Sequence, residues 1–126
     1  MTQMNNQDDI VLVVEDVPSN HFLIERSLEK IGLRTLQANN GQEALSLYQD
    51  FSNNIKLILM DLRMPVMDGY QAIKEIRDAG FKLPIIAQTA YLMPYEKNII
   101  INAGCDDLIT KPFRSTDIIN MVRKHL

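Results

Sequence analysis

The sequence predicts an α/β fold: a doubly wound, five-stranded parallel sheet with five helices on both faces. Two observations carry this prediction. Short apolar runs recur along the chain, with the length of strands that are buried on both faces of a sheet. Between them lie segments whose apolar residues recur every three or four positions, as on one face of a helix. Strand-like runs and helix-like segments alternate regularly over the 126 residues, which indicates one domain with right-handed crossovers.

Five segments are predicted as strands. Two of them, 10–14 and 57–60, are unbroken apolar runs that fit fully buried positions. The segment 33–38 alternates weakly, which indicates an edge or half-exposed strand. Pro84 is tolerated near the start of the fourth strand. In chain order the predicted strands are 10–14, 33–38, 57–61, 83–87 and 107–110.

The predicted helices begin or end at characteristic residues. Pro18 fits the first turn of the first helix, which Gly32 ends. Ser115 is expected to cap the last helix. The predicted helices begin at Pro18, after the turn Asn39-Asn40-Gly41, at about Asp68, at Pro94 and at Ser115, and the third and fourth end near Ala79 and Ala103.

Composition limits the classes of function. Residues 1–8 are predicted as a polar tail and residues 9–126 as the domain. The net charge is −3, with 13 basic and 16 acidic residues, which favours neither nucleic acid nor a membrane surface as a direct partner. The start of the chain lacks a secretory signal, so a cytoplasmic location is expected. Cys105 is the only cysteine, which excludes a disulfide framework. We predict that it is a buried packing residue.

Polar residues end four of the predicted strands. Glu15 and Asp16 follow the first, Asp61 the third, Thr89 the fourth and Lys111 the fifth. The carboxyl ends of parallel strands meet at one edge, so these side chains are expected to gather there. Two like charges about 4 Å apart cost about 4 kcal/mol at an effective dielectric of 20, so the three carboxylates need positive charge nearby.

Lys111 supplies one positive charge, and a hard divalent cation is the natural second. Mg²⁺ prefers one or two carboxylates together with waters and phosphate oxygens, and an oxygen-only ligand set disfavours zinc and copper. Phosphate can arrive as a ligand or become covalently attached. Asp61 is the best candidate nucleophile for an aspartyl-phosphate, because it ends the central strand. Thr89 can donate a hydrogen bond to a phosphoryl oxygen, and Lys111 can pair with another.

Five motifs in this order resemble the response-regulator receiver domain of two-component signalling, most closely the receiver of a hybrid histidine kinase. The resemblance covers about residues 9–126 and includes Asn20, four residues after Asp16. The motifs are Glu15-Asp16, Asp61 with Arg63-Met-Pro, Met67-Asp-Gly69, Gln88-Thr89-Ala90, and Asp106-Asp107 leading to Lys111-Pro112-Phe113.

The resemblance implies a flavodoxin-like strand order, 2-1-3-4-5, and a phosphorelay role. Asp61 would accept a phosphoryl group from a histidine kinase or a histidine phosphotransfer domain, and the resulting conformational shift would change partner binding. Asp16, the Asp61 carboxylate and the Arg63 backbone carbonyl would hold Mg²⁺, with Glu15 acting largely through water. Thr89 would be the switch and Lys111 would hold the phosphoryl group, with a cis Lys111-Pro112 bond.

Several positions raise questions of their own. Receivers usually carry an aromatic residue where this chain has Leu108, so the resemblance does not extend to the aromatic step of the switch. Arg63 and Tyr91 occupy positions that tune phosphoryl hydrolysis in the family. Ile99, Ile100 and Ile101 cannot all face the sheet, and one of Phe22 and Leu23 is expected to point outward. His21 and His125 are expected to be solvated surface residues.

Other functions stay open at this stage. The main alternative is a metal-dependent phosphohydrolase with an aspartyl-phosphate intermediate, although Arg63 stands where that class carries a second aspartate. A flavodoxin-like cofactor binder is disfavoured by the acidic loop after the first strand. A signalling module would catalyse its own phosphorylation and dephosphorylation instead of turning over a substrate. The sequence leaves open whether the chain acts alone or belongs to a longer kinase, and whether phosphorylation makes a dimer.

Overall fold

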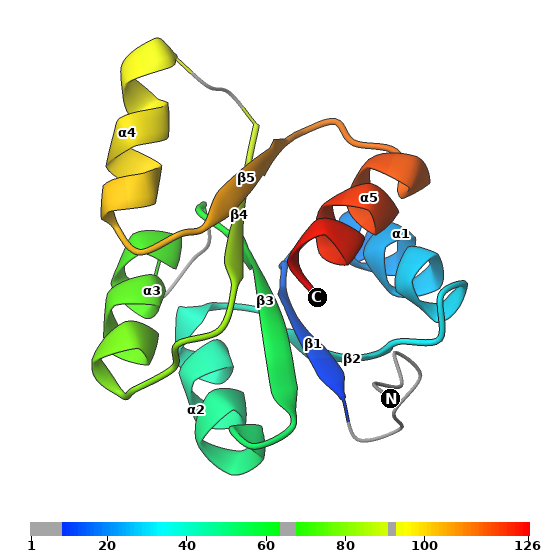
Figure 1. Cartoon of the computed structure of the whole chain (residues 1–126), viewed down its shortest axis with the longest axis horizontal. Coiled ribbons are helices and arrows are strands. Elements are labelled where there is room, and N and C mark those ends of the chain that lie inside the picture. The colour runs from blue at the N-terminus through cyan, green and yellow to red at the C-terminus, as the bar shows by residue number, and fades with distance from the viewer. Residues whose placement is uncertain (1–8, 64–67, 91–92) are drawn as a thin grey trace.

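The computed structural model describes residues 9–63, 68–90 and 93–126 (Figure 1). Strands and helices alternate throughout, as predicted. The predicted polar tail, residues 1–8, lies outside the described residues. In chain order the elements are β1 (Ile10–Val14), α1 (Pro18–Glu29), β2 (Arg34–Ala38), α2 (Gly41–Phe51), β3 (Ile55–Asp61), α3 (Gly69–Asp78), β4 (Ile85–Thr89), α4 (Pro94–Asn102), β5 (Asp107–Thr110) and α5 (Ser115–His125).

The five strands form one parallel sheet in the order β2-β1-β3-β4-β5, which confirms the predicted order. The two unbroken apolar runs became β1 and β3, which are neighbours in the interior of the sheet. β2 is an edge strand, and only Ala38 among its residues is buried. This confirms the interpretation of 33–38 as an edge or half-exposed strand. β3 lies at the centre, so its last residue, Asp61, ends the middle strand.

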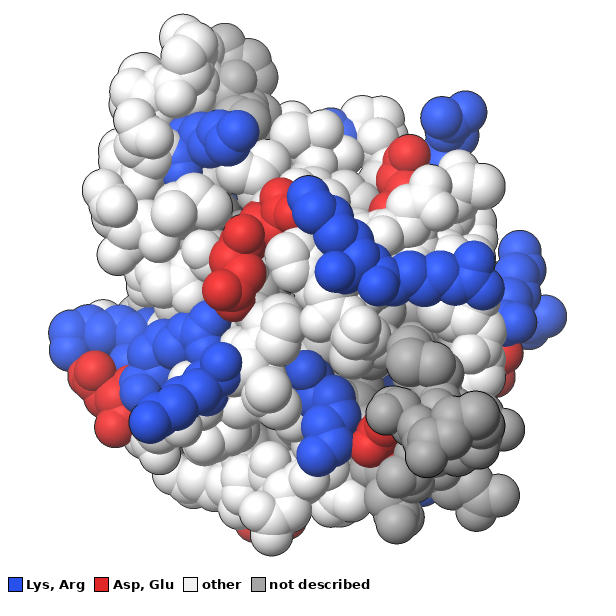
Figure 2. Space-filling view, in the orientation of Figure 1, with Lys and Arg blue, Asp and Glu red and all other residues white. Residues whose placement is uncertain are grey.

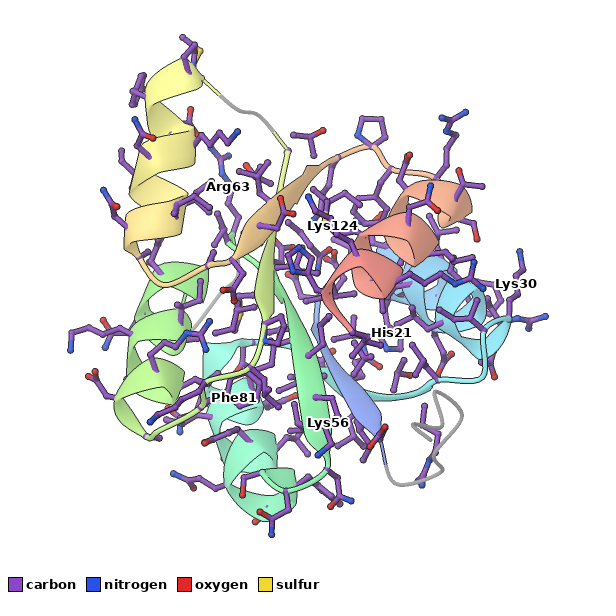
Figure 3. The ribbon with its side chains drawn as sticks, viewed as in Figure 1. His21, Lys30, Lys56, Arg63, Phe81 and Lys124 are labelled. Atoms are coloured by element: carbon purple, nitrogen blue, oxygen red, sulfur yellow. The ribbon has the colours of Figure 1, made fainter. Side chains whose placement is uncertain are left out.

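Helices cover both faces of the sheet. α1 and α5 lie on one side, and α2, α3 and α4 lie on the other (Figure 1). Alternate residues of β1 enter the two cores: Val11 and Val13 pack with α1 and α5, while Leu12 and Val14 pack toward the other helices. On that second face the rings of Tyr48 and Phe81 meet edge to face with centroids 5.5 Å apart, with Phe81 beside α2 in Figure 3.

The fourth strand begins later than predicted. The sequence placed its start at Leu83, whereas β4 begins at Ile85. Leu83 is exposed, and its carbonyl accepts a hydrogen bond from Arg77 and not from a strand. Pro84 has no N–H to give to a ladder, although its carbonyl accepts the Ile58 N–H at 3.0 Å.

Ser115 is not the cap of α5, which corrects a second expectation. The N-cap is Arg114, whose backbone N–H donates to Asp117 Oδ2 at 2.8 Å. The Ser115 hydroxyl instead lies 2.8 Å from the buried Ser27 hydroxyl of α1. Ser27 Oγ also lies 2.6 Å from the Leu23 carbonyl. Because Ser27 has a single hydroxyl hydrogen, which it donates to that carbonyl, Ser115 must donate across the helix pair.

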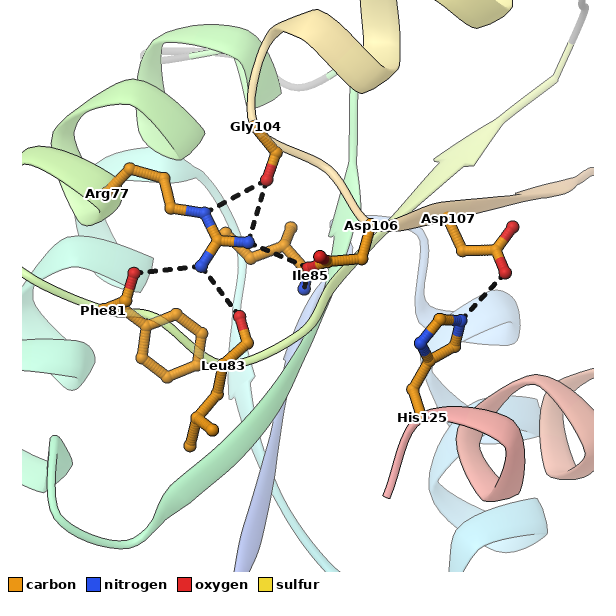
Figure 4. Close-up of polar contacts among 8 residues, drawn as sticks. All are labelled: Arg77, Phe81, Leu83, Ile85, Gly104, Asp106, Asp107 and His125. Carbon is orange, nitrogen blue, oxygen red and sulfur yellow. Dashed lines mark hydrogen bonds and ion pairs between the residues drawn. The ribbon is translucent and has the colours of Figure 1, made fainter.

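The amino end of β5 is tied to the C-terminal turn of α5. His125 Nε2 lies 2.8 Å from Asp107 Oδ2 (Figure 4). Lys124 Nζ lies 3.1 Å from the same oxygen. The expectation that His125 is merely solvated was therefore wrong, because Asp107 holds its ring. Figure 2 shows basic and acidic side chains next to one another on this face of the molecule, in keeping with the small net charge.

Cys105 is buried, as predicted, and burial raises the pKa of its thiol to about 12. Within the described ranges, no helix is both long and apolar enough to cross a bilayer.

Candidate functional site

Three carboxylates meet at the carboxyl end of the sheet. Glu15 and Asp16 follow β1 directly, and Asp61 is the last residue of β3 beside it. One carboxylate oxygen from each of the three lies within 4.8 Å of the others. Glu15 is 0% and Asp61 4% exposed, whereas Asp16 is exposed. The structure therefore brings the acids from the two strand ends together, with Asp16 on the solvent side.

Lys111 reaches into this acidic pocket from the end of β5. Its Nζ lies 2.9 Å from Asp61 Oδ2 and 3.1 Å from Glu15 Oε1, and its side chain is 18% exposed. The contact with Asp61 is a hydrogen bond, whereas the contact with Glu15 is an ion pair whose geometry leaves Glu15 Oε1 without a hydrogen bond. The Lys111-Pro112 peptide is cis, as the family resemblance implied.

The remaining carboxylate oxygens of the buried acids bind backbone N–H groups two residues on. Glu15 Oε2 accepts from Val17 at 3.1 Å, and Asp61 Oδ1 accepts from Arg63 at 3.0 Å. Each acid is therefore held by its own loop as well as by Lys111. These short loops orient the carboxylates toward one another before any ligand arrives.

Burial and neighbouring charges shift the pKa values of two side chains in the pocket. Burial raises the pKa of Glu15, and the neighbouring Asp61 charge adds to this, against the opposing effects of the Val17 N–H and Lys111. For Lys111, burial alone would lower the pKa, but its close contacts with the Asp61 and Glu15 carboxylates outweigh burial and raise the pKa. Lys111 is therefore firmly charged, and the raised pKa of Glu15 means that its carboxyl ionises less readily than that of an exposed glutamate.

The ligand set fits a hard divalent cation. Among the residues that the structure describes, it consists of carboxylate oxygens from three residues, without sulfur or imidazole in the cluster. Three carboxylates lie beside one ammonium in the described part of the chain, so acidic groups outnumber basic ones in the pocket. Glu15 Oε1 is also a buried oxygen with an unused hydrogen-bonding position, which a metal-bound water can fill.

Thr89 ends β4 next to this pocket. Asp61 pairs in register with Gln88, so Thr89 lies one residue beyond the strand position opposite Asp61. The Thr89 carbonyl accepts the Lys111 N–H at 2.7 Å, which joins the ends of β4 and β5. The backbone thus brings Thr89 and Lys111 to the same end of the sheet as the acids, while the role of the Thr89 hydroxyl stays a prediction.

Some of the predicted positions cannot be placed in the site. Tyr91 and residues 64–67, which include part of the Arg63-Met-Pro motif, lie outside the described residues. Arg63 is exposed, and its backbone N–H contacts Asp61, but the metal-binding role of its carbonyl stays a prediction. Leu108 is half-buried against the core and lines a groove along α5 with Asn120 and Met121.

Gly69 is a site residue whose role the sequence analysis missed. A Cβ at this position would collide with the Asp61 carbonyl oxygen and come within 2.7 Å of Leu62 Cα. Its N–H donates to the Leu62 carbonyl at 3.3 Å, so α3 begins packed directly on the end of β3. A signal was available: glycine is a poor helix former, and its presence at the first helical position indicates that another constraint selects it.

The surface expectations hold for α1 and α4. Phe22 is 57% exposed, while Leu23 packs against the core of the α1 face. On α4, Ile100 is fully buried, whereas Ile99 is 51% and Ile101 40% exposed. Both helices therefore present large apolar side chains to solvent, as the spacing predicted.

Comparisons with known proteins agree with this geometry. The family model described as the response regulator receiver domain matches residues 11–123. The chain is 39% identical over 119 residues to the sensor histidine kinase GacS of Pseudomonas protegens, covering 90% of this chain and 13% of that protein. It is 37% identical over 108 residues to the sensor histidine kinase RcsC of Escherichia coli strain K12, covering 86% of this chain and 11% of that protein. The chain thus spans about an eighth of these relatives.

Solved receiver-domain structures have the same fold as this chain. The receiver domain of the sensor histidine kinase PA1611 from Pseudomonas aeruginosa, solved with a magnesium ion in its active site cleft, superposes with a TM-score of 0.82 at 33% identity, covering 93% of this chain and 96% of that one. The chemotaxis protein CheY4 of Vibrio cholerae has a TM-score of 0.86 at 27% identity, with 94% and 98% covered. By family match, by identity and by fold, this chain belongs to the response regulator receiver domain family of two-component systems.

Proposed function

We propose that Asp61 is the phosphoacceptor of this receiver domain, which residues 9–126 form. The observation that carries the proposal is the position of its carboxylate at the end of the central strand, 2.9 Å from the Lys111 ammonium and within an acidic cluster. A carboxylate oxygen of Asp61 forms a bond to phosphorus while the P–N bond of a phosphohistidine breaks. The imidazole keeps the bonding electrons and is protonated. Hydrolysis later breaks the Asp61–phosphate bond and releases inorganic phosphate.

The other site residues bind and orient the phosphoryl group in this proposal. Lys111 pairs with one phosphoryl oxygen, and the Thr89 hydroxyl donates to another and acts as the switch. Asp16, Asp61 and the Arg63 carbonyl are the proposed Mg²⁺ ligands, with Glu15 acting through water. When bound, Mg²⁺ would neutralise charge that develops on the transferring group. The ligand chemistry and the position of Arg63 beside Asp61 support this assignment.

The proposed donor is a phosphohistidine on a kinase or a histidine phosphotransfer domain. The sensor kinases among the relatives support this partner class, and a cytoplasmic location goes with it in our proposal. Phosphorylation would change partner affinity by shifting the population of two conformations. The comparisons give no support to the phosphohydrolase alternative.

A mass measurement tests the proposal. The chain is incubated with Mg²⁺ and acetyl phosphate, and its intact mass is expected to increase by one phosphoryl group. Asp61→Asn should not be modified, whereas Asp50→Asn, which changes an exposed aspartate of α2, should be modified like the parent chain. Removal of Mg²⁺ with EDTA should abolish the gain. An unmodified parent chain at saturating donor, or a modified Asp61→Asn variant, contradicts the proposal.

A further inference from the structure

Gln88 is a buried amide that lies beside the acidic pocket. It is 1% exposed, and both Nε2 and Oε1 lack a hydrogen-bond partner among the residues that the structure describes. Gln88 pairs in register with Asp61, and its own carbonyl accepts the Leu62 N–H at 3.2 Å. The backbone is therefore fixed beside the end of β3, while the side chain has an unused donor and an unused acceptor.

The Gln88 side chain lies on the same face of the sheet as the buried acids. Successive residues of a strand point to opposite faces. Ile86 of β4 and Leu59 of β3 belong to the core under α1 and α5, so Gln88 and Asp61, each two residues further on, point to that face as well. The same alternation in β1 directs Glu15 there. Three polar side chains thus form a row across the neighbouring strands β1, β3 and β4.

The side chain of Lys111 crosses this row. Lys111 follows β5, whereas the Asp61 oxygen that it contacts belongs to β3, and β4 lies between these two strands. Ile109 belongs to the core under α1 and α5, and the bond from the Lys111 N–H to the Thr89 carbonyl continues the ladder, so Lys111 points to the same face. To reach Asp61 its side chain must pass over β4, in which Gln88 is the last residue that points to this face.

The unused groups of the two side chains are complementary. The ammonium of Lys111 has three N–H donors, and among the described residues it makes one hydrogen bond, to Asp61, besides the ion pair with Glu15. The small cavity that Gln88 helps to line has an apolar wall, so the amide group lies outside it. An ammonium with spare donors and an amide oxygen without a donor therefore lie at the same end of the same face.

We propose that Gln88 is a positioning residue for Lys111. Its amide oxygen accepts a hydrogen bond from the ammonium once Asp61 Oδ2 is no longer free to do so, as when Asp61 carries a phosphoryl group; in this respect the inference rests on the proposed function. The carboxylate is the stronger acceptor, which explains why Gln88 has no partner in the unmodified chain. The new bond keeps the ammonium over the pocket and removes the cost of an unpaired buried amide.

Crystal structures test the proposal without reference to activity. Asp61→Ala removes the competing acceptor, so in the metal-free variant Lys111 Nζ should lie within hydrogen-bond distance of Gln88 Oε1. The same contact is expected in the parent chain with Mg²⁺ and beryllofluoride, a phosphoryl mimic, which provides a test that does not depend on how well the variant folds. A Lys111 ammonium that turns to solvent or to Glu15 alone overturns the proposal.

Unfolding equilibria test the same bond in solution. Gln88→Met removes the amide and keeps a side chain of similar length, and Gln42→Met makes this change at an exposed position of α2. Relative to its effect in the parent chain, Gln88→Met should lower the folding equilibrium constant of Asp61→Ala by about tenfold or more, because a hydrogen bond from a charged donor is lost. Gln42→Met should have the same effect in both backgrounds. An equal effect of Gln88→Met in both backgrounds overturns the proposal.

The failure of this inference can be told apart from that of the proposed function. A parent chain that gains no phosphoryl group from acetyl phosphate refutes the role of Asp61. A parent chain that does gain one, without coupling between the substitutions at Gln88 and Asp61, refutes only the positioning of Lys111 by Gln88.

Discussion

Lys111 lies between two carboxylates of the proposed metal site. Its ammonium contacts Asp61 and Glu15, the buried members of the acidic cluster. A positive charge at this distance stabilises the ionised acids in the metal-free chain. It also makes the binding free energy of a second cation less favourable, by several kcal/mol at most. In our proposal the same charge pairs with a phosphoryl oxygen. One side chain would then weaken metal binding and favour phosphoryl binding.

Lys111→Met should separate these two effects. Removing the ammonium should raise Mg²⁺ affinity by at least about fivefold, because the acids lose their competing partner, while phosphorylation by acetyl phosphate falls. Calorimetric titration measures the affinity and intact mass measures the phosphorylation. Lys30→Met, at an exposed lysine after α1, should leave both unchanged. Unaltered or weaker Mg²⁺ binding in Lys111→Met would show that the ammonium does not compete with the cation.

Glu15 should make the metal-free chain less stable as its carboxyl ionises. Its folded pKa is raised above 4.5, so its protonated form favours the folded state, and this contribution is lost as pH rises through the folded pKa. Glu15→Gln should therefore stabilise the metal-free chain at pH 7. The gain should shrink as pH falls toward 4.5, where the parent is protonated as well. Urea unfolding across this range measures the difference, and a gain independent of pH would exclude ionisation as the cause.

At the scale of elements, one side chain of α3 joins the starts of two strands. Arg77 Nε and one terminal nitrogen donate to the Gly104 carbonyl at 3.0 and 2.8 Å, and the other terminal nitrogen donates to the carbonyls of Phe81 and Leu83 (Figure 4). Asp106 completes the set at 2.9 Å. The segments that precede β4 and β5 are thereby tied to the end of α3.

Arg77→Ala should lower the free energy of unfolding by about 2–4 kcal/mol, because several carbonyls lose their donor together. Arg77→Lys keeps the charge but has no planar fork, so it should recover less than half of the loss. Urea unfolding measures both variants. Full recovery by lysine would mean that charge alone, and not the geometry of the guanidinium, holds these segments.

The sequence was most informative about elements with strong periodicity. The apolar runs of β1 and β3 predicted buried strands, and the acids that follow them predicted the cluster, because the carboxyl ends of parallel strands meet at one edge. The predictions for Ser115 and Leu83 were wrong because residues far away in the sequence determine their hydrogen bonds. The Ser115 hydroxyl bonds to Ser27 of another helix instead of capping its own helix, and the Leu83 carbonyl accepts a hydrogen bond from Arg77. Neither partner is visible in the local pattern.

For the whole molecule, the acidic pocket joins the two neighbouring strands β1 and β3. A cation that binds the folded chain and not the unfolded one should stabilise the entire domain, by about 2.7 kcal/mol at a concentration of 100 times its Kd. Urea unfolding with and without Mg²⁺ measures this. Asp16→Asn should lose most of the effect and Asp50→Asn none of it. Equal stability of the parent chain with and without saturating Mg²⁺ would contradict a metal site built from folded strands.

The buried thiol of Cys105 makes the protein convenient for spectroscopy. With a pKa near 12 and almost no exposure, this sulfur carries a negligible thiolate fraction at neutral pH and should resist alkylating reagents. A cysteine introduced on the surface can then be spin-labelled or dye-labelled selectively, without first removing the native one. Distances between α4 and α5 could thus be followed in a chain that is otherwise unaltered.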